Sequence, residues 1–338
     1  MKSRFFCITT FAVVLSVVSQ LVAGTPAENL LKKPDEWYRS NEGRAALEGI
    51  LSWQTEYGDW PKNTDTTRMR TRSGKIPTGT FDNGATTAEI RVLARAFRIN
   101  GENRYRSAAL KGLDHILKAQ YPNGGWPQYY PLSTQYHRHI TFNDGTMIKL
   151  LELLTDVVSD QDFGFVDPSR RGEAEQAIKL GIECIVKCQI EVDGTPTVWC
   201  AQHHAETLEP VLARSYEHPS LSGAESAGIL RYLMSLDSPS PDVIRSVKAG
   251  AGWFDAAKIE GYRYRKSKSG PALSRDPKAP PLWARFYEIE TNRPIFSDRD
   301  GIIRYDIQEI GSERRGGYTW YGNWGVNVLK DYAEWPHW

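Results

Sequence analysis

The sequence predicts a mainly α-helical protein, an incomplete α/α toroid of about three helical hairpins with a less regular second lobe. The first observation is a repeat. Gln54, Gln120 and Gln189 each end a helix-like segment and lie 66 and 69 residues apart. The second is that a loop containing Gly, Pro and Trp follows each glutamine, and another helix-like segment follows each loop. Consecutive hairpins bury their apolar faces best when they close around a centre, which gives the toroid.

The first 24 residues are typical of a secretory signal peptide. Lys2 and Arg4 precede an apolar run that ends at Ala23 and Gly24 and is too short to span a membrane. We therefore expect cleavage near Gly24, a secreted or periplasmic protein, and no membrane contact afterwards. Loss of the two basic residues takes the formal net charge from +1 to −1, so no global positive field would attract nucleic acid.

Residues 25–235 contain the repeats, each of which reads as helix, turn, helix. The first helices have apolar residues at helical spacing in GRAALEGILSWQ, RYRSAALKGLDHILKAQ and EAEQAIKLGIECIVKCQ. The second helices start in FDNGATTAEIRVLARAF, FNDGTMIKLLELLTDVV and LSGAESAGILRYLM. Thr86 and Glu89 predict a capping box at the first of these starts. The loops before the second helices should all lie on one rim of the toroid.

Residues 236–338 have a different composition, with loop-rich stretches such as SKSGPALSRDPKAPP and an aromatic end. We expect a less regular lobe that covers one side of the toroid within a single module. The tryptophans of the repeat loops, Trp60 and Trp126, have two possible roles. They either fill the groove between hairpins, which we favour, or stack on sugars.

The strongest candidates for chemistry are Asp82 and Asp144, in TFDNG and TFNDG at the entrances of two successive helices. A single aspartate in such a place is often only an N-cap or an Asx-turn. Two at equivalent positions of adjacent repeats should converge, with Asn83 and Asn143 beside them and Glu225 on the same rim. Such a pocket suits Ca²⁺ or Mg²⁺, and the two carboxylates equally suit the acid and base of an inverting glycosidase.

Arginines indicate the charge of the substrate. Arg214 precedes the third rim loop, and Arg285, Arg293, Arg299 and Arg304 follow in the C-terminal region. Such residues are often a solvated surface with scattered ion pairs. The planar guanidinium is nonetheless well suited to clamp a carboxylate, and a neutral sugar needs no such cluster. Oxygens for a metal together with arginines for carboxylates favour an acidic polysaccharide.

The cysteines and one histidine pair have a structural and a functional interpretation. After signal removal Cys184, Cys188 and Cys200 remain, and we favour a disulfide from Cys200 to one of the other two over a metal site. The pair His203-His204 is either a general base or a hydrogen-bonded loop element, and we favour the loop element.

These motifs resemble the pectate lyases of polysaccharide lyase family ten. The resemblance runs from about Trp53 to Trp324. It rests on GDWPKN, FDNGAT, NGGWPQYYP, YHRHITFNDGTM, LARSYEHPSLSGAES and WARFYEIETNRPIFSDRDG. The first motif reads GDWPKN where a double Gly is common, which concerns the shape of the loop rather than the chemistry. The family implies an incomplete α/α toroid with a cleft against a second lobe.

The resemblance also implies residue roles. Asp82 and Asp144 would lie at the catalytic subsite around Ca²⁺ and the scissile galacturonate, and Arg214 would be the base. The substrate-binding side chains would be Arg285, Arg299, Asn83 and Asn143. No departure from the family pattern occurs at the aspartates and arginines among these positions.

The reaction implied is anti β-elimination of α-1,4-linked polygalacturonate, which gives 4,5-unsaturated oligogalacturonides. Ca²⁺ on the C6 carboxylate would make the C5 proton more acidic. An arginine base requires a neighbouring cation and desolvation to lower its pKa. The alternatives are an inverting glycoside hydrolase that uses Asp82 and Asp144, and a non-catalytic pectin-binding protein. We expect a monomer.

Overall fold

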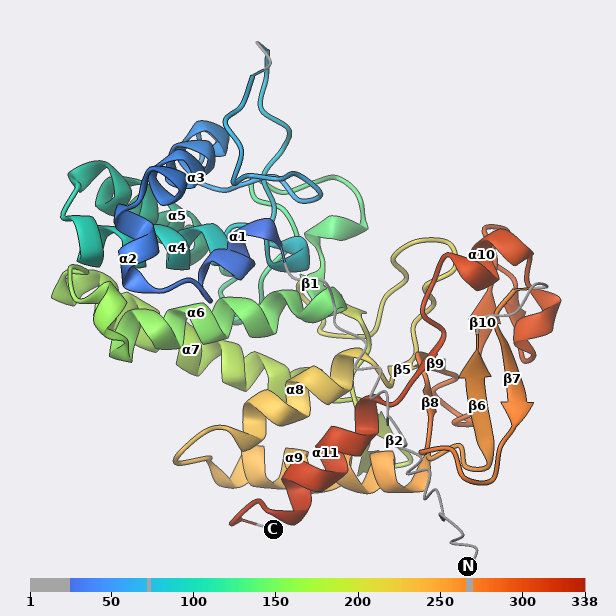
Figure 1. Cartoon of the computed structure of the whole chain (residues 1–338). Helices are drawn as coiled ribbons and strands as arrows, with labels where there is room; N and C mark the ends of the chain where they lie inside the picture. The colour runs from blue at the N-terminus through green and yellow to red at the C-terminus, as the bar shows by residue number, and fades with distance from the viewer. Residues whose placement is uncertain (1–24, 72–73, 266–269, 338) are drawn as a thin grey trace, which may run out of the picture.

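The computed structural model describes residues 25–71, 74–265 and 270–337, and most of its regular structure is helical (Figure 1). The predicted signal peptide, residues 1–24, lies outside the described residues. The long helices of the described chain are α3 (Asn41–Trp53), α4 (Thr87–Asn100), α5 (Asn103–Ala119), α6 (Thr146–Ser159), α7 (Pro168–Cys188), α8 (Glu225–Met234), α9 (Pro241–Ala256) and α11 (Trp324–Ala333). The short ones are α1 (Pro26–Leu30), α2 (Asp35–Arg39), α10 (Ser312–Gly316) and the 3-10 turns η1 (Asp82–Gly84), η2 (Tyr136–Arg138), η3 (Asn143–Gly145), η4 (Gln161–Phe163) and η5 (Ile307–Glu309).

The strands of the described residues are short and form two-stranded antiparallel pairs. In the longest pair, β6 (Tyr262–Arg265) lies beside β7 (Ala272–Arg275), with Tyr262 opposite Arg275. The other pairs are β1 (Ile140–Thr141) with β4 (Gln202–His203), β2 (Glu191–Val192) with β3 (Thr195–Pro196), β5 (Leu221–Ser222) with β9 (Phe286–Tyr287), β8 (Trp283–Ala284) with β12 (Tyr321–Gly322), and β10 (Phe296–Ser297) with β11 (Ile303–Arg304).

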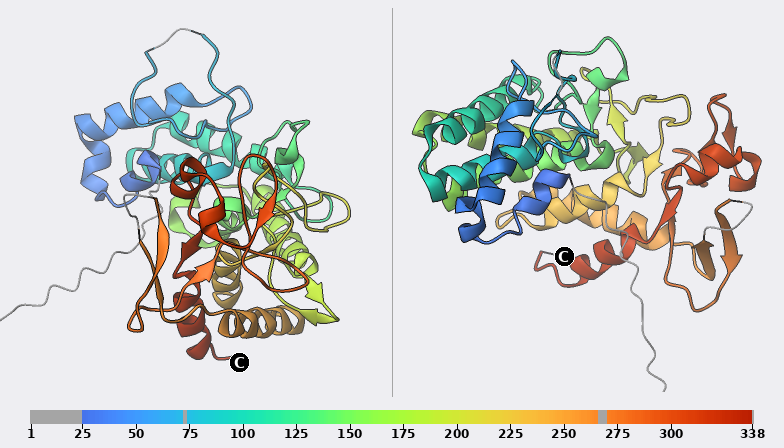
Figure 2. Two further views of the ribbon diagram at one scale, coloured as in Figure 1. Left: turned by 90° about the vertical axis from the view of Figure 1, so that its right-hand side faces the viewer. Right: turned by 45° about the horizontal axis from the view of Figure 1, so that its top comes forward.

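The long helices pack side by side in chain order, as the prediction of an open α/α toroid requires. α4 packs on α5, α6 on α7, and α8 on α9. α11 packs on both α8 and α9 and so supplies a fourth helical pair beyond the three predicted hairpins. Residues 257–323 separate α9 from α11, which hides this pair from a search for repeats of constant length. Figures 1 and 2 show the strands of this insertion gathered in a lobe beside the helices.

The three glutamines of the repeat join each outer helix to the next one. Gln120 follows α5, and its Nε2 donates to the carbonyl oxygens of Gly124 at 3.0 Å and of Ala177, in α7, at 2.9 Å. Gln54 and Gln189 make the corresponding bonds to their own loops and to α5 and α9. One amide thus bonds a carbonyl of its own loop and a carbonyl of the next outer helix. The spacing of the glutamines follows from this shared task.

The loop tryptophans have the structural role that we favoured. Trp60 is 0% exposed, and its Nε1 donates to the carbonyl of Ile50, in the last turn of α3, at 2.7 Å. The same bond joins Trp126 to Ile116, Trp199 to Ile185, and Trp283 to Phe254. Rings that solvent does not reach cannot stack on a sugar, so the alternative role is excluded for Trp60 and Trp126. Trp283 marks the fourth repeat.

Two local predictions are wrong. Thr86 and Glu89 form no capping box, because Thr86 has a φ of 70° and its hydroxyl donates to the carbonyl of Thr80 at 2.9 Å. The disulfide from Cys200 is not formed either, since all three cysteines are buried and free. Cys184 and Cys188 lie one turn apart on α7 with their Sγ atoms at 4.0 Å, about twice the length of an S–S bond. Within the described residues, no helix is long and apolar enough to cross a membrane.

Candidate active site where the two lobes meet

Two turns with the same backbone shape carry the predicted aspartates. η1 and η3 each have a positive φ at the middle residue, 55° at Asn83 and 53° at Asp144. Asp82 therefore matches Asn143, and Asn83 matches Asp144, because the order of residues is reversed between the two turns. The expectation that Asp82 and Asp144 occupy equivalent positions is wrong by one residue, although the turns do contact each other. The first residue of each turn faces inward, so Asp82 is buried, whereas Asp144 is the second residue of its turn and is exposed.

Asp82 is 2% exposed, and its charge is compensated from the loop that follows α3. Its Oδ2 accepts a hydrogen bond from the ammonium of Lys62, and its Oδ1 accepts the backbone N–H of Asn83 at 2.9 Å. A buried carboxylate requires such partners. Burial alone would lower the pKa of Lys62, but the hydrogen bond to Asp82 outweighs burial and raises it. Lys62 therefore stays charged beside Asp82.

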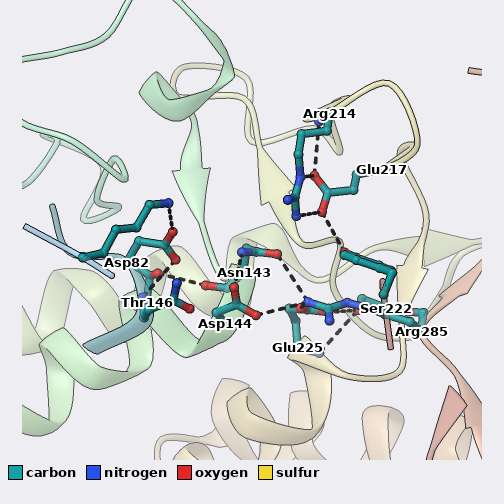
Figure 3. Close-up of polar contacts among 12 residues, drawn as sticks. Asp82, Asn143, Asp144, Thr146, Arg214, Glu217, Ser222, Glu225 and Arg285 are labelled. Carbon is teal, nitrogen blue, oxygen red and sulfur yellow. Dashed lines mark hydrogen bonds and ion pairs between the residues drawn. The ribbon is translucent and has the colours of Figure 1, made fainter. Parts of the chain in front are cut away.

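Asp144 lies between an amide and an arginine (Figure 3). Its Oδ2 accepts a hydrogen bond from Nδ2 of Asn143 at 2.9 Å, and its Oδ1 lies 3.4 Å from Nη2 of Arg285. The side chain keeps 36% of its surface exposed. Asn143 also accepts from Arg285, through its Oδ1 at 3.4 Å. Asp144 can therefore reach a ligand while its orientation is held from two sides.

Arg285 comes from the link between β8 and β9, in the C-terminal lobe, and it connects that lobe to the helical rim. Its Nη2 donates to Oε1 of Glu225, the rim acid at the start of α8. Burial lowers the pKa of Arg285, but the charge of Glu225 outweighs burial and raises the pKa above its usual value. Ser222 donates to the other oxygen of Glu225. Nε and Nη1 of Arg285 have no hydrogen bond to a described residue, and because Nε is buried, Nη1 is the nitrogen left for a ligand.

Arg214 is held by Glu217, one turn along the same loop (Figure 3). Nε of Arg214 donates to Oε2 of Glu217 at 2.6 Å, and Nη2 donates to Oε1. The hydroxyl of Tyr318 donates to the same Oε1 at 2.7 Å. Burial lowers the pKa of Arg214, but the hydrogen bond and the charge of Glu217 outweigh burial and raise it. In this arrangement Arg214 is a protonated guanidinium.

The remaining predicted residues lie at the edges of this group. Arg299 is exposed and pairs with Glu313 at 3.1 Å, and its backbone carbonyl accepts a hydrogen bond from Ser215 at 3.0 Å. That bond joins the loop of Arg299 to the loop of Arg214. Asn83 lines a cavity of about 540 Å³ together with Lys62 and residues of α1, α4 and α6. The structure thus brings Asp144, Asn143 and Arg285 into direct contact and places Asp82, Arg214, Arg299 and Asn83 around them.

The histidine pair is the loop element that we favoured. His203 is 0% exposed, its Nε2 accepts the backbone N–H of Cys200 at 3.1 Å, and its Nδ1 bonds the carbonyl of Leu208 at 2.7 Å. Burial lowers the pKa of His203 to about 4, so the ring is neutral. His204 accepts two backbone N–H groups of its own loop through Nδ1. Both ring nitrogens of His203 are used, so it has none left to act as a base.

The rim provides oxygen donors that match a hard cation in kind. In residues 25–71, 74–265 and 270–337, no group of three or more His, Cys, Asp or Glu side chains lies close enough to hold a metal ion. Ca²⁺ takes about six to eight oxygens, so Asp82 and Asp144 would supply only part of its coordination. Water and the oxygens of an acidic ligand would have to supply the rest. The donor chemistry therefore fits a cation that binds together with such a ligand.

Three residues of this group were missed in the sequence. Lys62 is the partner of Asp82, and Glu217 and Tyr318 hold Arg214. Glu217 had a detectable signal, because it lies three residues after Arg214 in a loop, where an acid can fold back on a guanidinium. Tyr318 had none, since it is 101 residues from Glu217 along the chain.

Comparison with known proteins places the chain among lyases of pectic acid. A sequence model of the pectic acid lyase family matches residues 54–329, which is most of the chain. The chain belongs to the pectic acid lyase family. The match confirms the resemblance that the rim and loop motifs indicated. A comparison with curated protein sequences finds no match.

Two solved structures of a family 10 polysaccharide lyase from Cellvibrio cellulosa are similar to this family member. Both are 36% identical to it, and the similarity covers 93% of this chain and 98% of that one, with TM-scores of 0.82 and 0.81. One of them is an aspartate-to-alanine mutant in complex with trigalacturonic acid. The likeness confirms the predicted fold class over nearly the whole chain.

Proposed function

We propose that the protein is a pectate lyase that cleaves α-1,4-linked polygalacturonate by anti β-elimination and releases 4,5-unsaturated oligogalacturonides. Membership of the pectic acid lyase family supports the class of reaction. The substrate is inferred from the solved structure of a relative, 36% identical, that has trigalacturonic acid bound. The rim carries two carboxylates, Asp82 and Asp144, each paired with a basic side chain, Lys62 or Arg285, and such a charged surface suits a polymer with one carboxylate on each sugar.

Two arginines would hold the carboxylates of the substrate. Arg285 has Nη1 available, and its orientation is fixed by Glu225 and Asp144. Arg299 is exposed, and a surface pair such as the one with Glu313 contributes little, so a uronate carboxylate can replace Glu313 at small cost. In the proposal the amides of Asn83 and Asn143 would bind hydroxyl or carboxylate oxygens of the same sugars.

Asp82 and Asp144 would hold Ca²⁺ together with the substrate. When bound, the cation makes the C5 proton more acidic by withdrawing charge through the C6 carboxylate. The partners of the two aspartates differ in a way that suits this task. Lys62 holds the buried Asp82 through an ion pair, and Arg285 keeps the exposed Asp144 in place. The oxygen donors are thus oriented before the ligand arrives.

Arg214 would take the C5 proton. It lies on the loop that contacts the Arg299 loop, beside the rim, and its Nη1 has no hydrogen bond to a described residue. Because Glu217 raises the pKa of Arg214, the neutral base forms only at alkaline pH or when a bound cation lowers the pKa again. We therefore expect activity to rise with pH well past neutrality.

Export to the periplasm or beyond would follow from the N-terminal pattern of residues 1–24. The three free thiols are compatible with an oxidising compartment because all are buried. Burial raises the pKa of the Cys200 thiol, which keeps it protonated and unreactive.

The product of the reaction separates this proposal from the alternatives. The protein is incubated with polygalacturonate, and ultraviolet absorbance is followed for the new C4–C5 double bond, with and without a calcium chelator. We expect absorbance to rise, to stop in excess chelator and to return with added Ca²⁺. New reducing ends without absorbance would establish a hydrolase, and binding without either signal would establish a pectin-binding protein.

A further inference from the structure

Arg214 and Glu217 form a bidentate ion pair beside the rim. We propose that Glu217 is a positioning residue for the reaction: it orients the guanidinium of Arg214 and stabilises that group once it has taken the C5 proton. This inference rests on the proposed lyase function. The side chain of Glu217 bonds Arg214 and Tyr318 rather than Asp82 or Asp144.

The contacts of Glu217 leave it one orientation. Its Oε2 accepts the backbone N–H of Arg214 at 3.2 Å and Nε at 2.6 Å, while its Oε1 accepts Nη2 and the hydroxyl of Tyr318. The side chain of Glu217 is only 5% exposed. Since both oxygens are occupied, the carboxylate cannot turn away without losing several hydrogen bonds. The nitrogen of Arg214 that remains is Nη1, which points away from Glu217 (Figure 3).

Aromatic rings fix the plane of the guanidinium. Cζ of Arg214 lies 5.0 Å from the ring centre of Tyr216 and 5.6 Å from that of Tyr318. Arg314 lies against the same two rings, at 4.4 Å from Tyr216 and 5.5 Å from Tyr318. A guanidinium held by a bidentate carboxylate and two rings has little freedom left. Nη1 is therefore presented in one direction.

The electron balance of the step explains why a carboxylate belongs there. The lone pair of neutral Arg214 forms a bond to the C5 proton, and the C5–H electrons form the C4–C5 double bond. The C4–O bond breaks, and the leaving glycosidic oxygen takes a proton from water. Arg214 thereby becomes a cation beside the anion of Glu217. A buried aspartate supports the histidine of a serine protease triad in the same way, by orienting it and stabilising its charged form.

Glu217 is the negative charge closest to this base. The titratable and charged groups around Arg214 within the described residues are Glu217, Tyr216, Tyr318, Tyr136 and His137, together with the cations Arg314 and Arg285, which lie across the tyrosine rings. Burial raises the pKa of Tyr136 and Tyr318, and burial lowers the pKa of His137, so all three side chains are neutral at neutral pH. Glu217 is the charged group in direct contact with the guanidinium, so removal of its charge should change the field at Arg214 more than removal of any of these neutral groups.

The test compares kcat, KM and their pH profiles for the wild type, Glu217→Gln and Glu217→Asp on polygalacturonate. Without the anion Arg214 loses its proton more easily, so the rising limb of kcat in Glu217→Gln should move to lower pH. Its limiting kcat should fall about tenfold or more, because a hydrogen bond to a charged group is lost, while KM changes less. Glu217→Asp keeps the charge on a shorter arm, so its limb should stay near that of the wild type with a smaller loss of kcat.

A matched control is the pair of Arg170 and Asp114 on the outer helices, where Nε and Nη2 bind the two carboxylate oxygens at 2.6 and 2.9 Å. Asp114→Asn should change neither kcat nor the profile. A lower kcat in Glu217→Gln with an unmoved limb would reduce Glu217 to a structural role and overturn the proposal. If Glu217→Gln does not fold, an unchanged kcat in Glu217→Asp overturns it instead. If Arg214 is not the base, the result is different, because Arg214→Ala would then keep the kcat of the wild type.

Discussion

The loop tryptophans and the rim turns belong to the same repeats, and they follow opposite rules. In four repeats a buried tryptophan donates one hydrogen bond to the last turn of the helix before it, from Trp60 to Trp283. At the rim the partners change from repeat to repeat. Asp82 pairs with a lysine of its own repeat, whereas Asp144 meets Arg285 of the other lobe. The residues that build the toroid repeat the same contacts, whereas the residues of the candidate site have different contacts in each repeat.

The two rim aspartates differ in burial, and this difference predicts different costs of removal. Asp82→Ala and Asp144→Ala should each lower kcat by at least about 10²-fold, since in the proposed function each would hold Ca²⁺ beside the reacting sugar. Asp144 is exposed, so its variant should keep the wild-type free energy of unfolding within about 0.5 kcal/mol. Asp82→Ala leaves the half-buried Lys62 unpaired and should also lose stability.

Steady-state kinetics on polygalacturonate and denaturant unfolding of both variants separate these effects. Near-normal turnover in either variant would show that its aspartate only stabilises the turn.

A buried acid behind the first rim turn predicts a pH dependence of stability. Burial raises the pKa of Glu89 from 4.5 to about 7, and its Oε1 accepts a hydrogen bond from Thr66 at 2.8 Å. Between these pH values the folded state binds a proton that the unfolded chain has lost, so stability falls as pH rises from about 4.5 to about 7 and stays low above. The loss is at most about 3 kcal/mol. Glu89→Gln should remove it.

Thermal unfolding at about pH 5 and about pH 9 checks this expectation. The glutamine variant should gain on the wild type only at the higher pH. An equal difference at both values would show that Glu89 does not titrate in this range.

The scaffold glutamines should affect stability without affecting turnover. Gln120→Ala removes both hydrogen bonds from Nε2 and should lower the free energy of unfolding by about 2 kcal/mol. The matched control is Gln176→Ala, because Gln176 is exposed on α7 and should change little. Urea unfolding and kcat are measured for both. A lower kcat in Gln120→Ala with an unchanged free energy of unfolding would show that this scaffold residue also affects turnover.

The sequence predicted the toroid because the bonds of Gln54, Gln120 and Gln189 recur at nearly constant spacing. It did not reveal the pair of α9 and α11, because residues 257–323 separate the two helices along the chain. The site was predicted as a set of residues but not as a set of contacts. Asp82 is buried and Asp144 is exposed because the aspartate stands one residue later in the second turn. The positions that face inward depend on the backbone conformation of the turns.

Partners from distant parts of the chain were the least accessible. Arg285 and Tyr318 reach the rim from the C-terminal lobe through β8, β9 and the segment before β12. Nothing in the local pattern of either segment states that Arg285 will meet Glu225 or that Tyr318 will meet Glu217. Motif spacing identified Arg285 but not Tyr318, and only the packing of the lobes brings each to its partner.

The central claim is that Arg214 takes the C5 proton, and the kinetics of its variants test that claim most directly. Initial rates on polygalacturonate are followed by the absorbance of the new double bond for the wild type, Arg214→Ala and Arg214→Lys, from neutral to strongly alkaline pH. We expect Arg214→Ala to lose at least about 10²-fold in kcat with a smaller change in KM. Arg214→Lys should retain little activity, because an ammonium is shorter and cannot form the fork with Glu217. An unchanged kcat with a raised KM in Arg214→Ala would contradict the claim and make Arg214 a substrate-binding residue.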